Sequence, residues 1–250
     1  MPPKFKLPYL TDRHIAEEVE MLLAEYGNKF APILEPPVPV DEIVELYLEL
    51  ELELMDMKAE FKVDDVHGAL WVNKRKVGID QSLDPDENPR KLGRYRFTLA
   101  HEAGHWRLHR RLFQKRAANQ LNLVAGNAER PEYICRSGDK EPIEIQADMF
   151  AATLLMPEAM VRRVWHEQNR SSEPLSLDEI REKQDLMDIC LVNSRSHFKE
   201  GDDAEVESIF EVAALPMAAA FEVSPPAMKN RLKKLKLLVK KKEKTFFDKF

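Results

Sequence analysis

The sequence predicts an α+β protein in which a small antiparallel or mixed sheet packs on two helices, followed by a helical C-terminal region. Residues 48–54 alternate Leu and Glu, which is the period of a strand, and two short strand-like segments follow before residue 80. From about Arg90 to Leu112, and again after Pro142, apolar residues recur every three or four positions, as in a helix. The 250 residues are 44% hydrophobic and 33% charged, so the chain can bury a core and fold as a globular protein.

The N-terminal segment begins with an amphipathic helix whose first turn Thr11 can cap. Its apolar residues recur at helical spacing on one face: Ile15, Val19, Leu22 and Leu23. A short helix is predicted over residues 41–47, after a proline-rich link. From Leu48 to Leu54, Leu alternates with Glu, which predicts a half-buried strand with its acidic face in water.

A β-hairpin is predicted next, because the strand-like residues 69–72 and 77–80 flank the polar residues 73–76. The hairpin leads into the helical pattern that continues to Leu112. The pattern loosens between residues 126 and 142, so we predict a surface excursion there.

The remainder of the chain is predicted to be helical. Pro142 suits the first position of a helix that continues into the apolar residues after it. Ser176 and Glu179 have the spacing of a capping box that begins another helix. Two further helices are expected over residues 205–221 and 225–239. We assign four of their apolar residues to a shared core: Val223, Leu232, Leu235 and Leu238.

Composition and cysteine spacing lead us to expect a reduced, cytoplasmic protein without a membrane partner. No apolar run approaches the roughly 20 residues that span a bilayer. The start, Met1–Lys6, lacks the apolar stretch of a signal peptide. Cys135 and Cys190 do not have CxxC spacing, which is expected of reduced thiols rather than of a disulfide framework.

The strongest chemical signal is the run His101-Glu102-Ala103-Gly104-His105 within the predicted helix. Residues four apart lie on nearly the same face of a helix, so the two imidazoles can bind one Zn²⁺. They leave coordination positions for a third protein ligand and a water. The metal lowers the pKa of that water toward about 7, and Glu102 can take its proton and pass it to a leaving amine. The small Ala103 and Gly104 allow another element to pack closely behind the ligands.

The third ligand must come from another segment, and Glu144 and Asp148 offer two carboxylates on one face of the next helix. Their spacing resembles the ExxxD helix of the gluzincin peptidases, in which the Glu binds zinc and the Asp hydrogen-bonds a ligand histidine. By this resemblance we assign Glu144 as the ligand and Asp148 as the residue that orients a histidine. The reversed assignment remains open at this point.

His109 lies one turn further along the helix and is not expected to bind the metal. Its separation from His101 corresponds to a rise of about 12 Å, which is too far for one ion. The longer HExxHxxGxxH pattern is also absent. We therefore interpret His109 as a surface or packing histidine. His14 and His166 receive the same interpretation, as do His67 and His197, although either of the last two could enter the cleft.

Two segments, Arg96–His105 and Glu144–Pro157, together resemble the ImmA/IrrE family of metallopeptidases. The resemblance begins at about Pro37 and covers about half of the chain. Family members are intracellular proteins of bacteria or mobile elements with a gluzincin core, and characterised members cleave a helix-turn-helix transcriptional repressor encoded nearby. The resemblance therefore implies a zinc metallo-endopeptidase that acts on such a repressor. That repressor should be a separate chain, because residues 1–60 lack the pattern of a DNA-binding domain.

On this basis we divide the chain into three parts. Residues 1–58 contain N-terminal helices and a strand, residues 59–165 form a zincin-like catalytic core, and residues 166–250 form a helical C-terminal region with a basic tail. Residues 227–250 contain ten Lys or Arg against two acidic residues, although the whole chain has a net charge of −6. The helices around residues 219–232 superficially resemble a helix-turn-helix. We favour a packed helix pair with a solvated tail over a nucleic-acid-binding unit.

The main alternative is a zinc-stabilised regulatory protein that binds a transcription factor or DNA without proteolysis. Glu102 favours the enzyme, because a structural zinc site needs no carboxylate beside its ligands and usually closes with Cys or His. Residue spacing does not single out an oxyanion-stabilising group. Four residues are candidates for that role: Tyr95, Tyr133, Arg136 and His197.

Overall fold

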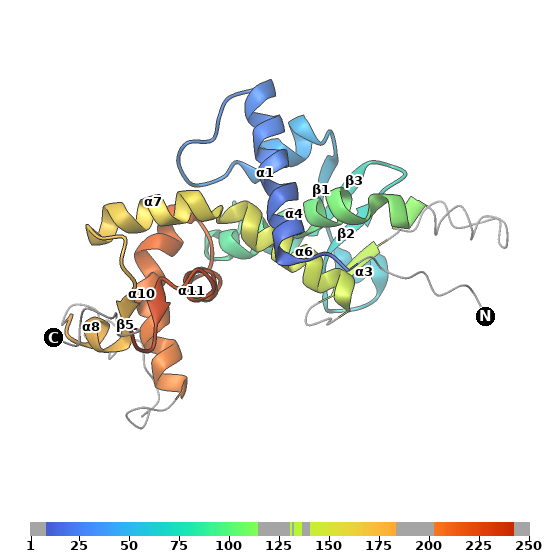
Figure 1. The fold of residues 1–250 in the computed structure, drawn as a ribbon. Helices are drawn as coiled ribbons and strands as arrows, with labels where there is room; N and C mark the ends of the chain where they lie inside the picture. The colour runs from blue at the N-terminus through green and yellow to red at the C-terminus, as the bar shows by residue number, and fades with distance from the viewer. Residues whose placement is uncertain (1–8, 115–130, 132, 137–140, 184–202, 243–250) are drawn as a thin grey trace. The chain divides into compact units, whose positions relative to one another are not determined.

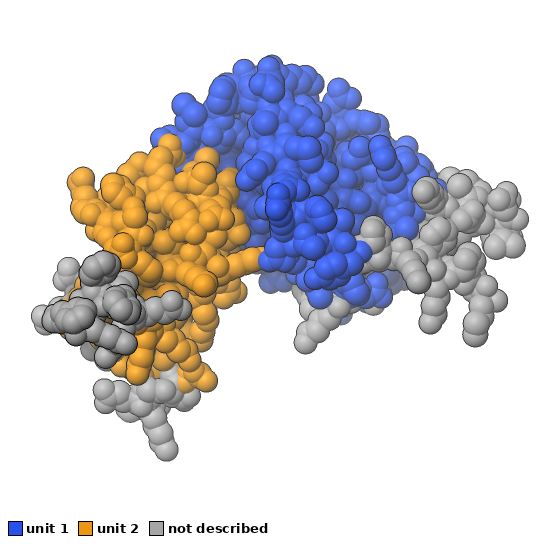
Figure 2. Space-filling view, in the orientation of Figure 1, with its two compact units in different colours: residues 1–155 blue, residues 156–250 orange. Residues whose placement is uncertain are grey.

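The structure is a computed structural model that describes residues 9–114, 131, 133–136, 141–183 and 203–242. The chain divides into two compact units, residues 1–155 and 156–250 (Figure 2). The boundaries expected from the sequence, after residues 58 and 165, differ from this division. The first of them separates a strand from its partner in the same sheet. Across the described part of the chain, no helix has both the length and the apolar character needed to cross a membrane.

Unit 1 contains a four-stranded mixed sheet with the strand order β1-β3-β2-β4 (Figure 1). The strands are β1 (Glu51–Met55), β2 (Val66–Trp71), β3 (Lys76–Asp80) and β4 (Tyr133–Arg136). β1 is parallel to β3, whereas β2 is antiparallel to both β3 and β4. The predicted α+β class with a small mixed sheet is confirmed.

The predicted hairpin is confirmed, with Trp71 paired to Lys76 across its turn. The first strand begins three residues later than expected, because Leu48 still belongs to the preceding helical turn and Glu49 has a φ of 52°. β4 lies within the stretch that was predicted to be a surface excursion, and that prediction is wrong for these four residues. Backbone pairing with β2 places them in the sheet.

The N-terminal helices follow the predicted pattern. α1 (Asp12–Lys29) is capped by the Thr11 hydroxyl, which accepts a hydrogen bond from the His14 backbone N–H. The helix buries Ile15, Val19 and Leu22, and it packs against α6 (Pro142–Leu155) (Figure 1). The short predicted helix is present as α2 (Val40–Glu42) and the π-helical turn η1 (Ile43–Tyr47). The remaining short helices of this region are α3 (Met57–Phe61), η2 (Gln81–Leu83) and η3 (Pro89–Lys91).

Two helices form the centre of unit 1. α4 (Leu92–Gly104) continues into the π-helical turn η4 (His105–His109), and it packs against α6 (Pro142–Leu155). A Cβ atom added at Gly104 would lie 3.1 Å from the Phe150 Cβ, so there is little room for a side chain between the helices. This close approach confirms the interpretation of the small residues beside the histidines.

The two faces of the sheet have different neighbours. The Cα position of Gly68 on β2 faces Thr98 and Glu102 of α4. Because successive strand residues point to opposite faces, Ala69 and Trp71 lie on the other side. There they form an apolar cluster with Met57 of α3. Val66 belongs to the same cluster, because the register of β2 shifts between Val66 and Gly68. The sheet therefore places the backbone of β2 directly against α4.

Unit 2 is mainly helical in its described residues. Its elements are α7 (Glu158–Asn169), β5 (Leu175–Ser176), α8 (Leu177–Arg181), α10 (Asp203–Phe221), α11 (Pro225–Lys234) and β6 (Leu238–Val239). The capping box at Ser176 and Glu179 is present as predicted. α10 packs against α11, and the four predicted core residues around this helix pair are buried.

α11 ends earlier than expected. The helix was predicted to continue to residue 239, but its last residue is Lys234. Lys236 has a φ of 57°, and the backbone N–H of Leu237 bonds to the carbonyl of Leu232. The chain then pairs with β5 through β6. Leu238 is therefore a core residue, but in a strand rather than in a helix.

Candidate metal centre

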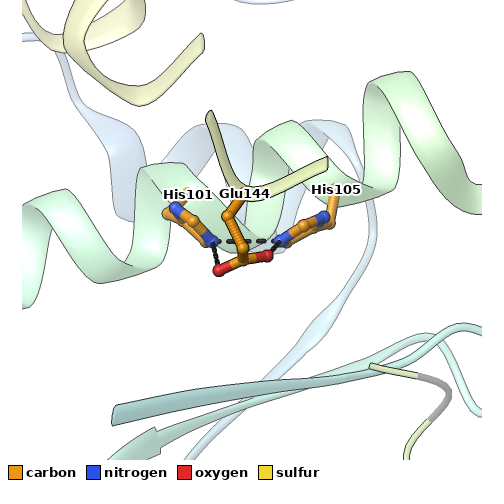
Figure 3. Close-up of side chains that lie close together, drawn as sticks. All are labelled: His101, His105 and Glu144. Carbon is orange, nitrogen blue, oxygen red and sulfur yellow. Dashed lines mark hydrogen bonds and ion pairs between the residues drawn. The ribbon is translucent and has the colours of Figure 1, made fainter. Parts of the chain in front are cut away.

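Three side chains from two helices converge at the centre of unit 1 (Figure 3). His101 lies in α4 and His105, one turn later, is the first residue of η4; their Nε2 atoms are 3.0 Å apart. Glu144 projects from α6 between them. Its Oε2 is 3.3 Å from the His101 Nε2 and its Oε1 is 2.9 Å from the His105 Nε2. All three side chains are buried.

These three groups fit a zinc ion. Tetrahedral zinc with bonds of about 2.0–2.1 Å holds its ligand atoms roughly 3.3 Å apart. The observed separations of 2.9 to 3.3 Å are close to that value. Two imidazoles and one carboxylate are also the donor set of a catalytic zinc site, which keeps its fourth position open. His101, His105 and Glu144 can therefore hold a metal ion.

Asp148 fixes the orientation of the first histidine. Its Oδ1 lies 2.9 Å from the Nδ1 of His101. A carboxylate accepts this hydrogen bond, so the proton of the neutral ring lies on Nδ1 and the lone pair lies on Nε2. The ring thus presents an electron pair toward Glu144. Of the two assignments left open by the sequence, the geometry favours Glu144 as ligand and Asp148 as its supporting residue.

The protonation states of the buried groups suit metal binding. Burial lowers the pKa of His105 to about 3, so this ring is neutral at pH 7. Burial alone would raise the pKa of Glu144, but its hydrogen bonds to His101 and His105 hold that pKa well below its usual range. A neutral imidazole and an ionised carboxylate are the forms that coordinate a metal.

Glu102 is fully buried beside this group. Neither of its carboxylate oxygens has a hydrogen-bond partner among the residues that the structure describes. Burial raises its pKa to about 8, a shift that the charge of His101 opposes and that of Glu144 reinforces. The carboxylate abuts the sheet, because a Cβ added at Gly68 would lie 2.4 Å from the Glu102 Oε1. The ionised form of this carboxyl is the form that can accept a proton.

Among the candidate oxyanion residues, only Tyr95 has a side chain within the described part of the chain. The Tyr95 hydroxyl donates a hydrogen bond to Asp41, at 2.5 Å. The Nε2 of His67, the other histidine considered for the cleft, is 2.7 Å from the guanidinium of Arg94. The remaining candidates lie outside the described parts: His197 altogether, and Tyr133 and Arg136 in their side chains.

Two polar residues lie next to the candidate ligands without having been assigned a part in the site. His109 was interpreted as a surface or packing histidine; it is 1% exposed, so it is not a surface residue, and its ring is hydrogen-bonded to that of His105. Its Nδ1 lies 3.1 Å from the Nδ1 of His105, and its Nε2 lies 2.9 Å from the Oε1 of Gln146. The four-residue spacing from His105 was the available signal, because residues four apart on a helix are neighbours. Gln146 has no such local signal.

Comparison with protein families gives a match to the segment that contains this centre. The model of the IrrE N-terminal-like domain, peptidase family M78, matches residues 56–184. A comparison with curated proteins gave no match. The matched segment spans both helices that carry the candidate ligands, together with Glu102. The match covers more than half of the chain, and the chain therefore belongs to the M78 family of metallopeptidases, through its IrrE N-terminal-like domain.

Proposed function

We propose that this protein is a zinc-dependent metallo-endopeptidase. The observation that carries the proposal is the buried Glu102 beside a His101, His105 and Glu144 cluster. A structural zinc site needs no additional carboxylate, and the cost of burying one without a partner must be balanced by a function. Membership of a metallopeptidase family supports the same conclusion.

Each residue has a distinct part in the proposed hydrolysis. His101, His105 and Glu144 would hold a zinc ion, which would act as a Lewis acid toward the scissile carbonyl and would make a bound water more acidic. Glu102 accepts the proton of the attacking water and passes it to the amine that leaves. Glu144 contributes a negative charge among the ligands, and Asp148 holds the His101 ring in one tautomer and orientation.

We infer that the substrate is a helix-turn-helix transcriptional repressor. This inference rests on the resemblance to the ImmA/IrrE family, whose characterised members cut such repressors. Cleavage would relieve the repression of the genes that the repressor controls.

The ion pairs of unit 2 argue against a nucleic acid as the partner. Lysines of α11 and of the segment after it pair with acidic residues of the same unit: Lys229 with Glu207 and Glu211, Lys233 with Glu207, Lys240 with Asp203, and Lys242 with Glu179. Binding to DNA depends on cations that neutralise phosphates. Cations already paired within the protein contribute less to such binding.

The direct test incubates the purified protein with the repressor encoded beside its gene. The parent protein with zinc should produce a defined fragment, and both a chelator and the Glu102→Gln substitution should suppress it. If the parent protein cuts nothing, yet parent and variant bind the repressor equally, a regulatory protein that binds without proteolysis replaces the enzyme.

A further inference from the structure

A short chain of hydrogen bonds extends from His105 away from the metal position. The Nδ1 of His105 is 3.1 Å from the Nδ1 of His109. The Nε2 of His109 is in turn 2.9 Å from the Oε1 of Gln146 on α6. These two hydrogen bonds therefore join His105, the second histidine ligand, to α6, the helix that carries Glu144.

The direction of these hydrogen bonds follows from the acceptor at the far end. The carbonyl oxygen of Gln146 can only accept, so the Nε2 of His109 must carry a proton. A neutral His109 then has a lone pair on Nδ1, which accepts from the Nδ1 of His105. The lone pair of His105 is thereby left on Nε2, which faces Glu144 at 2.9 Å.

The hydrogen bonds between His105, His109 and Gln146 lie in a buried, partly aromatic environment. His105, His109 and Gln146 are 0%, 1% and 5% exposed, and the ring of Phe113 lies 5.9 Å from His105 and 6.2 Å from His109. Water has little access, so a lost partner is poorly replaced. His105 and His109 are also the first and last residues of the π-helical turn η4, and such turns occur frequently at functional sites.

We propose that His109 and Gln146 are positioning residues that hold the His105 ring with its Nε2 toward the metal. The pair does for His105 what Asp148 does for His101, although with neutral groups in place of a carboxylate. Neither residue binds the metal itself. The proposal rests on the metal site of the proposed function, but it does not depend on peptidase activity.

Substitutions at residue 109 separate the hydrogen bond from the shape of the side chain. His109→Leu fills a similar volume and leaves the Nδ1–H of His105 without its acceptor. His109→Asn keeps an oxygen at about the position of the lost Nδ1. His166→Leu, in the exposed part of α7, is the matched control. Gln146→Met removes only the far acceptor, and it tests the same chain if His109→Leu does not fold.

The zinc dissociation constant is measured by competition with a chelator, and the protonated ring nitrogen of His105 is identified by ¹⁵N NMR of the zinc-loaded proteins. We expect His109→Leu to bind zinc about 10 to 100-fold more weakly than the parent, with a smaller loss in Gln146→Met. His109→Asn and His166→Leu should stay within a few-fold of the parent. The parent should carry the His105 proton on Nδ1.

Three results would overturn the inference. If folded His109→Leu binds zinc as tightly as the parent, the positioning role is ruled out but the metal site is not. The same holds for Gln146→Met if only that variant folds. Equal weakening in His109→Leu and His109→Asn would assign the effect to packing rather than to the hydrogen bond. A parent protein that binds no zinc would overturn the metal site and the inference together.

Discussion

The contact between β2 and Glu102 makes Gly68→Ala the most specific test of the proposed base. The new Cβ would lie 2.4 Å from the Glu102 Oε1 and 3.0 Å from the Thr98 Cγ2, whereas ordinary contacts begin at 3.4 Å. β2 is paired on both sides, with β3 and β4, so the strand resists movement. The carboxylate is the end of a flexible side chain, and we expect it to move by about 1 Å.

A displacement of about 1 Å at a catalytic group reduces the rate by about 10²-fold. We therefore expect Gly68→Ala to cut the repressor about 100-fold more slowly than the parent while it keeps one zinc per chain. Initial rates of fragment formation and elemental analysis measure these two quantities. The matched control is Gly78→Ala on the neighbouring strand, where the new Cβ would meet Met55, Met57 and Trp71 on the opposite face. This control should change stability rather than the rate of the folded protein. Parental cleavage rates in Gly68→Ala would refute the placement of Glu102 against β2.

The other predictions concern the ligands and the basic end. Glu102→Gln should keep zinc and fold but cut about 10² to 10⁴-fold more slowly, and parental rates would reject the proposed base. Glu144→Gln should weaken zinc binding, because a neutral amide replaces an anionic ligand, whereas Asp148→Asn should do so less severely, by about 10 to 100-fold, in chelator competition. His101→Ala should abolish stoichiometric zinc, and retention of zinc would show that the ligand set is wrong. Removal of residues 240–250 should leave the zinc content and the temperature of thermal unfolding unchanged. The ion pairs that it removes from the described part of the chain are exposed and contribute little to stability. An unfolded product would show that residues 240–250 pack against the rest of the protein.

Features set by neighbours in the sequence could be predicted. Thr11 and the Ser176 capping box act within one helical turn, so residue types and spacing suffice to locate them. The convergence of His101 and His105 follows from helix geometry alone. Assigning Glu144 required the resemblance to a known family, because its partners lie on another helix.

Features set by distant segments could not be predicted. β4 is a strand because β2 pairs with it, and its residues stand in a stretch without periodicity. His109 has its distinctive environment because Gln146 reaches it from α6. Gly68 was not singled out, because only the packing of β2 on α4 gives it a reason to be glycine. The candidate ligands and Asp148 could therefore be assigned from the sequence and the resemblance, whereas Gln146 and Gly68 could not.

We propose that His101, His105 and Glu144 together hold one zinc ion. Anomalous scattering at the zinc edge, measured on crystals of the zinc-loaded protein, tests this claim most directly. We expect one peak per chain, about 2.0–2.2 Å from the Nε2 of each histidine and from an oxygen of Glu144. A zinc-loaded protein whose peak lies elsewhere, or whose peak lacks any of these three ligands, would contradict the account.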